Sequence, residues 1–267
     1  MNSRNRFPTE LIYQIFSLLI VFIIVHSIYI SIIRPQAEQF IQQEHQLMLA
    51  DTAYVQKRNF YVVIRDFEQE ACFILMIWAL AIMAFKGVSS WKQNQLLDVD
   101  ILQLPYELPI GLEDTRALLK RINELPQAMH QYLLPRALKM TIQRFSATRD
   151  VHDAHTAMRD ICDSEAQRLD TELSIIRYIA WAIPSVGFIG TVRGIGDALS
   201  QANRAMEGDI TGVTESLGVA FNSTFIALVI SIVLMFFIHQ LQLLQERLVL
   251  DTENYCDENL VSRLRSQ

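Results

Sequence analysis

Residues 181–200 read WAIPSVGFIGTVRGIGDALS, and residues 215–239 read ESLGVAFNSTFIALVISIVLMFFIH. Each stretch is long and apolar enough to cross a lipid bilayer, which takes about 20 residues of α-helix. Both are interrupted by small and polar residues, including four glycines within ten residues of the first stretch. In membrane helices, small residues allow a second backbone to approach closely. The two stretches therefore predict membrane helices that face other helices as well as lipid.

Three glycines of the first stretch share one helix face, because Gly187, Gly190 and Gly194 are spaced three and four residues apart. Thr191 and Arg193 add polar groups that lipid cannot satisfy. The second stretch carries its own small and polar residues: Gly218, Asn222, Ser223 and Thr224. This combination predicts helices that pack closely and line a polar path.

Composition agrees with a membrane protein. Of the 267 residues 51% are hydrophobic and only 19% are charged, and the mean hydropathy is +0.20. The formal net charge of −6 is spread along the chain, which argues against a nucleic-acid surface. With only three cysteines, a disulfide framework is not expected.

The apolar runs predict an all-α, polytopic membrane protein with four transmembrane helices and a cytoplasmic helical domain. The first run is longer than the apolar core of a secretory signal, which is about 7–15 residues, so we expect an uncleaved span. The four expected spans are residues 10–33, 71–86, 176–200 and 215–239. The expected cytoplasmic segments are residues 1–9, 87–175 and 240–267, and the expected periplasmic loops are residues 34–70 and 201–214.

Orientation follows from basic residues, which mark the cytoplasmic side of short loops. They are concentrated between the second and third spans, whereas the loop after the third span has only Arg204. Both termini are therefore expected in the cytoplasm. The first loop counts against this assignment, because it contains four basic residues: Arg34, Lys57, Arg58 and Arg65.

Within the cytoplasmic segment, the apolar spacing of residues 112–125 predicts an amphipathic helix. No proline or glycine occurs between Arg136 and Pro184, and apolar residues recur every three or four positions. We therefore expect one long helix that enters the third span. Its acidic residues are expected to form a solvated face: Asp160, Asp163, Glu165, Asp170 and Glu172.

Three histidines are candidates for chemistry. His26 lies within the first expected span, where it either handles protons or simply bonds a neighbouring helix or the interface. His152 and His155 have a helical spacing that would suit a metal, but no third or fourth ligand is evident. No nucleophile and base set appears beside them, so the sequence does not predict an enzyme.

The pattern Pro184-x-x-Gly187-x-x-Gly190-Thr191-Val192-x-Gly194-Ile195 resembles the third span of the MotA/TolQ/ExbB family of ion-channel proteins. The next span, from Glu215-x-Leu217 to Thr224, is similar to that family as well. The resemblance is specific over residues 184–233 and only architectural elsewhere.

The resemblance implies a ring-forming stator in a bacterial inner membrane. Five copies would surround a dimer of a MotB/TolR/ExbD-like single-span partner that carries a membrane aspartate. Protons or sodium ions would pass between that aspartate and threonines of the ring, and a cytoplasmic rotor or effector would be a further partner. No cofactor beyond the transported ion is implied.

Residue by residue, the resemblance places Thr191 and Thr224 on the ion pathway. Asn222 and Ser223 lie just before Thr224, so we expect them to add polarity to the same pathway. The helix-packing or partner-facing positions would be Pro184, Gly187, Gly190, Gly194 and Gly218.

The chain also departs from the family pattern. Position 193 is an arginine, which we expect either to pair with Asp197 one turn later or to extend to the interface. The transported ion and the branch of the family stay open. Two alternatives remain beside the stator: a non-conducting scaffold ring of the same fold, and a transporter that needs no partner.

Overall fold

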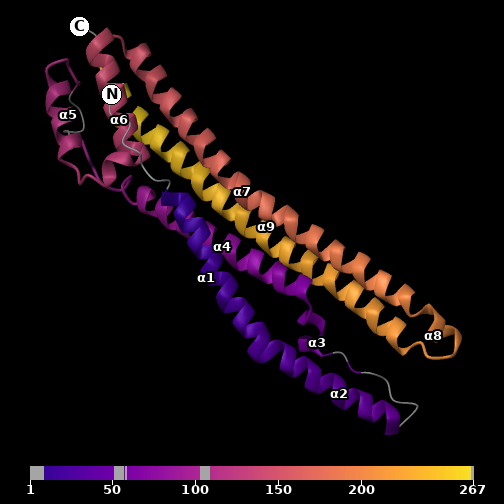
Figure 1. Cartoon of the computed structure of the whole chain (residues 1–267). Helices are drawn as coiled ribbons and strands as arrows, with labels where there is room; N and C mark the ends of the chain where they lie inside the picture. Colours follow the sequence, from indigo (N-terminus) through magenta and orange to yellow (C-terminus); the bar gives the residue numbers. More distant parts are fainter. Residues whose placement is uncertain (1–8, 51–56, 58, 103–108, 266–267) are drawn as a thin grey trace. The chain divides into compact units, whose positions relative to one another are not determined.

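The computed structural model describes residues 9–50, 57, 59–102 and 109–265 (Figure 1). Residues 1–8, expected in the cytoplasm, and residues 51–56 and 58 of the expected first loop lie outside the described part. The helical elements, in chain order, are α1 (Thr9–Ile28), η1 (Tyr29–Ile33), α2 (Arg34–Ala50), α3 (Phe60–Ile64), α4 (Phe67–Asn94), α5 (Asp114–Glu124), η2 (Met129–Gln131), α6 (Leu133–Thr148), α7 (Val151–Ser200), α8 (Ala202–Met206), α9 (Thr211–Asn259) and η3 (Val261–Arg263).

The all-α fold class is confirmed, since the described residues contain no strand beyond an isolated bridge. Four helical segments are long and apolar enough to cross a membrane: Leu11–Glu44, Phe67–Asn94, Val151–Ser200 and Thr211–Arg263. The chain divides into two compact units, one of residues 1–83 and 175–238 and the other of residues 84–174 and 239–267. We call them the membrane unit and the polar unit, and describe each by itself.

In the membrane unit, large apolar side chains lie on the outside. Trp181 is 71% exposed and Phe188 is 64% exposed, whereas Gly187 and Gly190 of the same helix are buried. Apolar exteriors of this kind are unfavourable in water and suit lipid or another membrane helix. The distribution therefore supports a membrane environment for this unit.

The polar unit has a conventional apolar core. It is formed by α5, α6, the first part of α7 and the last part of α9, with Phe145 and Ile142 fully buried. The end of the chain joins this core through a bridge between Ile110 and Leu264. The Ile110 N–H donates to the Arg263 carbonyl at 2.8 Å.

The long helix expected from Arg136 onward is interrupted, which corrects the sequence analysis. Arg149 adopts a left-handed backbone with φ of 59°, and its N–H donates to the Phe145 carbonyl at 2.8 Å to close α6. Asp150 Oδ1 then accepts the His152 N–H at 2.8 Å, as a helix N-cap does. The capping residue Asp150, rather than a glycine or proline, therefore sets the boundary between α6 and α7.

Candidate functional site

The close contact between α7 and α9 in the membrane unit depends on glycine. A Cβ atom added to Gly187 would lie 2.4 Å from the Ala227 Cβ and 3.0 Å from the Ser223 carbonyl oxygen. One added to Gly190 would lie 2.6 Å from the Ser223 side chain. One added to Gly194 would come within 2.8 Å of α9 atoms. Any larger residue at these positions would push the two helices apart.

Two other glycines of the membrane unit, Gly196 and Gly218, behave differently. A Cβ on Gly218 would meet no described atom within 4 Å, and the same holds for Gly196. The sequence suggests that Gly218 packs helices or faces a partner, and within this chain its position is open. Pro184 lies inside α7, which continues as a helix on both sides of it.

Two threonine hydroxyls meet where α7 and α9 are closest. Thr191 Oγ1 and Thr224 Oγ1 are 2.5 Å apart, and both residues are half-buried. Thr191 Oγ1 also donates to the Ala220 carbonyl at 3.0 Å, and Thr224 Oγ1 donates to the Gly187 carbonyl at 3.1 Å. The two sequence-predicted threonines, which are 33 positions apart in the chain, are therefore brought into direct contact.

These hydroxyls have more acceptors than protons. Each hydroxyl has one proton and two lone pairs. The two protons are shared among two backbone carbonyls and the contact between the hydroxyls themselves. Such a pair can redirect a proton toward an arriving anion, or accept a hydrogen bond from an arriving acid or water, without leaving a buried donor unpaired.

Ser223 and Asn222 do not lie together. Ser223 is 1% exposed, contacts Gly190 and donates to the Val219 carbonyl at 3.0 Å. Asn222 instead lines a cavity of about 250 Å³. Its other lining residues come mainly from α2, α3, the residues around α3 and the start of α9. Both residues were expected on the ion pathway, but only Ser223 lies in the contact that holds the threonines.

Arg193, for which the sequence suggests either a pair with Asp197 or extension to the interface, pairs instead with another helix. Its guanidinium donates to Glu68 Oε2 of α4 at 2.9 Å. Asp197, the expected partner, forms no ion pair within the described part of the chain. The reason is that α4 begins at Phe67, so that Glu68 lies beside Gly190 and within reach of Arg193. Sequence reasoning missed Glu68 because it placed residues before 71 in a loop.

The polar unit holds an ion-pair network that the sequence suggested was solvated. Glu165 is only 2% exposed, and it accepts from Arg136 at 3.0 Å and from Arg168 at 2.5 Å. Burial by itself would raise the pKa of Glu165, but the hydrogen bonds and charges of Arg168 and Arg136 outweigh it and hold the pKa below its usual range. Arg168 and Lys86 both also pair with Glu172, at 2.8 and 2.7 Å.

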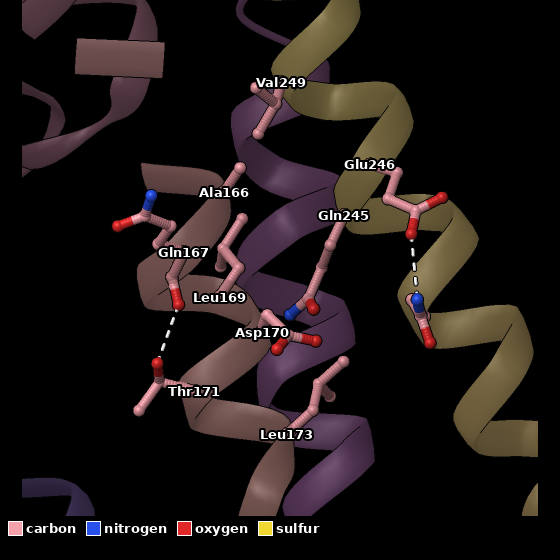
Figure 2. A pocket seen from close by; sticks show the side chains of 10 residues that line it. Ala166, Gln167, Leu169, Asp170, Thr171, Leu173, Gln245, Glu246 and Val249 are labelled. Atoms are coloured by element: carbon pink, nitrogen blue, oxygen red, sulfur yellow. Dashed lines mark hydrogen bonds between the residues drawn. The ribbon is translucent and has the colours of Figure 1, made fainter. Parts of the chain in front are cut away.

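The polar unit also contains a cavity of about 540 Å³ between α7 and α9 (Figure 2). Leu169, Leu173 and Val249 supply its apolar lining, and Gln245 is 3% exposed at its wall. The Gln245 Oε1 atom has no hydrogen-bond partner among the described residues. Nothing in the described part of the chain gathers three or more His, Cys, Asp or Glu side chains in a geometry that could hold a metal.

The fold and the site together define a class: a polytopic helical membrane protein with a polar path in a close helix contact. Residues 128–254 match the model of the MotA/TolQ/ExbB proton channel family, a range that includes both threonines. The match identifies this segment, just under half of the chain, with that family of channel proteins. Among curated proteins and among solved structures, none matches the chain at a significant level.

Proposed function

We propose that the chain is an ion-conducting stator subunit of a MotA/TolQ/ExbB-like motor, which couples the flow of protons or sodium ions to mechanical work. The single observation that supports this most is the 2.5 Å contact between the Thr191 and Thr224 hydroxyls. Those are the two positions that the family resemblance assigns to the ion path. Their hydroxyls lie in the membrane unit, where few groups can compensate for a charge.

The chemistry of the pair suits a carboxylate that changes protonation state. An ionised carboxylate would accept hydrogen bonds from both hydroxyls, whereas a protonated one would donate to a hydroxyl lone pair. Within the chain, Glu68 lies close to Gly190 but is engaged by Arg193. We therefore assign the shuttling carboxylate to an aspartate of a partner, a dimer of a MotB/TolR/ExbD-like single-span protein.

Assembly into a ring of five in a bacterial inner membrane completes the proposal. Phe221 and Phe225 on α9, and Ile189 and Val192 on α7, are all more than half exposed in the single chain. These faces would be covered by lipid, neighbouring copies or the partner. Both termini and the polar unit would lie in the cytoplasm, where a rotor or effector could bind.

The test is ion flux in proteoliposomes that contain the chain with and without its single-span partner, together with the stoichiometry by native mass spectrometry. We expect a five-to-two complex that conducts only with the partner. Thr224→Val should reduce the flux about 10- to 100-fold, because it removes a hydrogen bond to a charged group. Thr214→Val, an exposed threonine near the start of α9, is the matched control and should leave the flux unchanged.

The alternatives give different results. A ring without flux in the presence of the partner would support a non-conducting scaffold. Robust flux from the chain alone would support a transporter that needs no partner. Replacing sodium with choline at constant pH, and then varying pH without sodium, would identify the ion.

A further inference from the structure

The membrane unit contains a second polar cluster, centred on Glu70 near the start of α4. Glu70 is 4% exposed; its Oε1 lies 2.6 Å from His26 Nδ1, and its Oε2 accepts from Arg34 at 2.5 Å. We propose that His26 and Glu70, held by Arg34, form a proton-binding site whose occupancy regulates the ion path at Thr191 and Thr224. The regulatory part rests on the proposed function, whereas proton binding does not.

The backbone conformation brings His26 and Arg34 to the same partner. They are eight residues apart, and eight residues of regular α-helix end about 80° past two full turns. Between them, Tyr29–Ile33 forms a π-helical turn, which contains more residues per turn and compensates for that offset. The buried residues of this segment accordingly recur every four positions: Val21, Val25, Tyr29, Ile33 and Ala37. Such turns are rare and often occur at functional sites.

The surroundings hold the His26 and Arg34 side chains in place. The His26 ring stacks on Phe22 with centroids 5.4 Å apart and an interplanar angle of 13°. The Arg34 guanidinium lies 4.4 Å from the centroid of the Phe67 ring. Tyr29 is 2% exposed, and its hydroxyl has no hydrogen-bond partner among the described residues. A fixed pair with an unpartnered polar atom nearby differs from an ordinary helix contact, where buried polar groups are satisfied.

Other ionisable groups face this region from every neighbouring helix. They are Tyr29 and Arg34 on the segment of His26, Arg65, Asp66, Glu68 and Cys72 at or before α4, Arg193 on α7 and Glu215 on α9. Glu68 pairs with Arg193, and Arg65 pairs with Glu215 at 3.1 Å and with Asp66 at 3.7 Å. Among the described residues, the cationic or titratable side chains in direct contact with Glu70 are those of Arg34 and His26.

The proton has a defined place in this cluster. With a neutral imidazole, the charges of Glu70 and Arg34 cancel. One proton added to the imidazole nitrogen raises the net charge of the cluster from zero to one and turns the 2.6 Å contact into an ion pair. The side chain of His26 is 39% exposed, whereas that of Glu70 is 6% exposed. His26 is thus the outer member of the pair, and the Glu70 carboxylate is the enclosed one.

One helix connects this cluster to the threonines. Glu70 and Glu68 lie two residues apart on α4, and they bond to α1 and α7, respectively. Glu68 packs against Gly190, which is next to Thr191 in the chain. A change in the attraction between His26 and Glu70 therefore acts on a helix that contacts α7 beside the ion path. Coupling between two such sites typically changes binding about 5- to 150-fold.

Proton binding is tested by nuclear magnetic resonance on the full chain labelled with ¹⁵N-histidine in lipid nanodiscs. His26→Asn assigns the His26 signal, and His26→Gln serves the same purpose if the first variant does not fold. Spectra are recorded from about pH 8 to about pH 5, and we expect them to show both the neutral and the doubly protonated form of the His26 ring. Glu70→Gln should alter that titration, whereas Glu68→Gln should not. A His26 ring that keeps one protonation state over this range overturns the proposal.

Regulation is tested by the pH dependence of flux through the complex with its partner. We expect the wild-type flux to change about tenfold more across this pH range than that of His26→Asn. Identical profiles in the two proteins would overturn the regulatory role. If the wild-type complex conducts no ion, the proposed function fails and the regulatory role falls with it, while the resonance experiment still decides whether the proton site exists.

Discussion

The helices α7 and α9 contact each other with opposite kinds of residue in the two units. In the membrane unit the contact uses Gly187, Gly190 and Ala227. In the polar unit the corresponding residues include Leu169 on α7 and Val249 on α9. Lipid is as apolar as a leucine side chain, so close backbone packing and hydrogen bonds hold membrane helices together. In water, burial of large apolar groups is the main favourable term.

The same difference appears in the polar groups. The membrane unit joins α7 and α9 through neutral hydroxyls and backbone carbonyls around Thr191 and Thr224. The polar unit buries a full carboxylate, Glu165, between two arginines that reach solvent. A partly hydrated network can stabilise an ion pair that would be expensive deeper in a membrane. The contact between α7 and α9 therefore depends on a different interaction in each unit, and substitutions can separate the two.

The largest effect is expected from removing a fully buried aromatic side chain of the polar unit. Phe145→Ala should lower the free energy of unfolding by about 3–5 kcal/mol, because the side chain is fully buried and its removal leaves a void. Met140→Ala on the same helix, which is 45% exposed, should change it by less than about 0.5 kcal/mol. Denaturant unfolding of the full chain in detergent measures both. Equal losses in the two variants would contradict the core assignment.

A smaller effect is expected from the ion-pair network. Glu165→Gln should lower the free energy of unfolding by about 1.5–3 kcal/mol near neutral pH, because it weakens hydrogen bonds between charged groups. Since the pKa of Glu165 is lowered from 4.5 on folding, its contribution is present above about pH 4.5 and is lost as the pH falls through the native pKa.

The measurement is the melting temperature of both proteins across this pH range. The difference in melting temperature between wild type and Glu165→Gln should narrow below about pH 4.5, because the Glu165 carboxyl of the unfolded chain takes up its proton there first. Asp163→Asn, at an exposed position of the same helix, is the control and should stay close to wild type throughout. A constant gap would mean that the ionised carboxylate is not the source of the stability.

The smallest effect is expected in the membrane unit. There, enlarging a side chain at the contact between α7 and α9, rather than shortening one, should destabilise the fold. Gly187→Ala should cost about 1–3 kcal/mol, because its Cβ would overlap the Ala227 side chain. Gly196→Ala, which faces open space on the same helix, should have no cost and should stabilise the helix by up to about 1 kcal/mol. Melting in detergent compares the two variants. If Gly187→Ala is as stable as Gly196→Ala, the close contact is not what joins these helices.

Several errors of sequence reasoning have one cause: it treated neighbours along the chain as neighbours in space. For Arg193 the sequence suggests either a pair with Asp197, four residues away, or extension to the interface, but the side chain bonds to Glu68, which is 125 positions away. Asn222 and Thr224 are adjacent but one in the sequence, yet Asn222 lines a cavity with residues of α2 and α3, whereas Thr224 bonds to α7. Glu165 was placed on a solvated face because its pattern of charges is common on such faces, and only packing against α6 buries it.

The sequence by itself determined the all-α class, the four apolar runs and the glycine face that allows α7 and α9 to meet. These follow from length, hydropathy and helical periodicity, which are local properties. The tertiary structure alone decided which charges meet: His26 and Arg34 with Glu70, and Arg193 with Glu68. Pairing of charges depends on the rotation and register of separate helices, and a single π-helical turn is enough to change both.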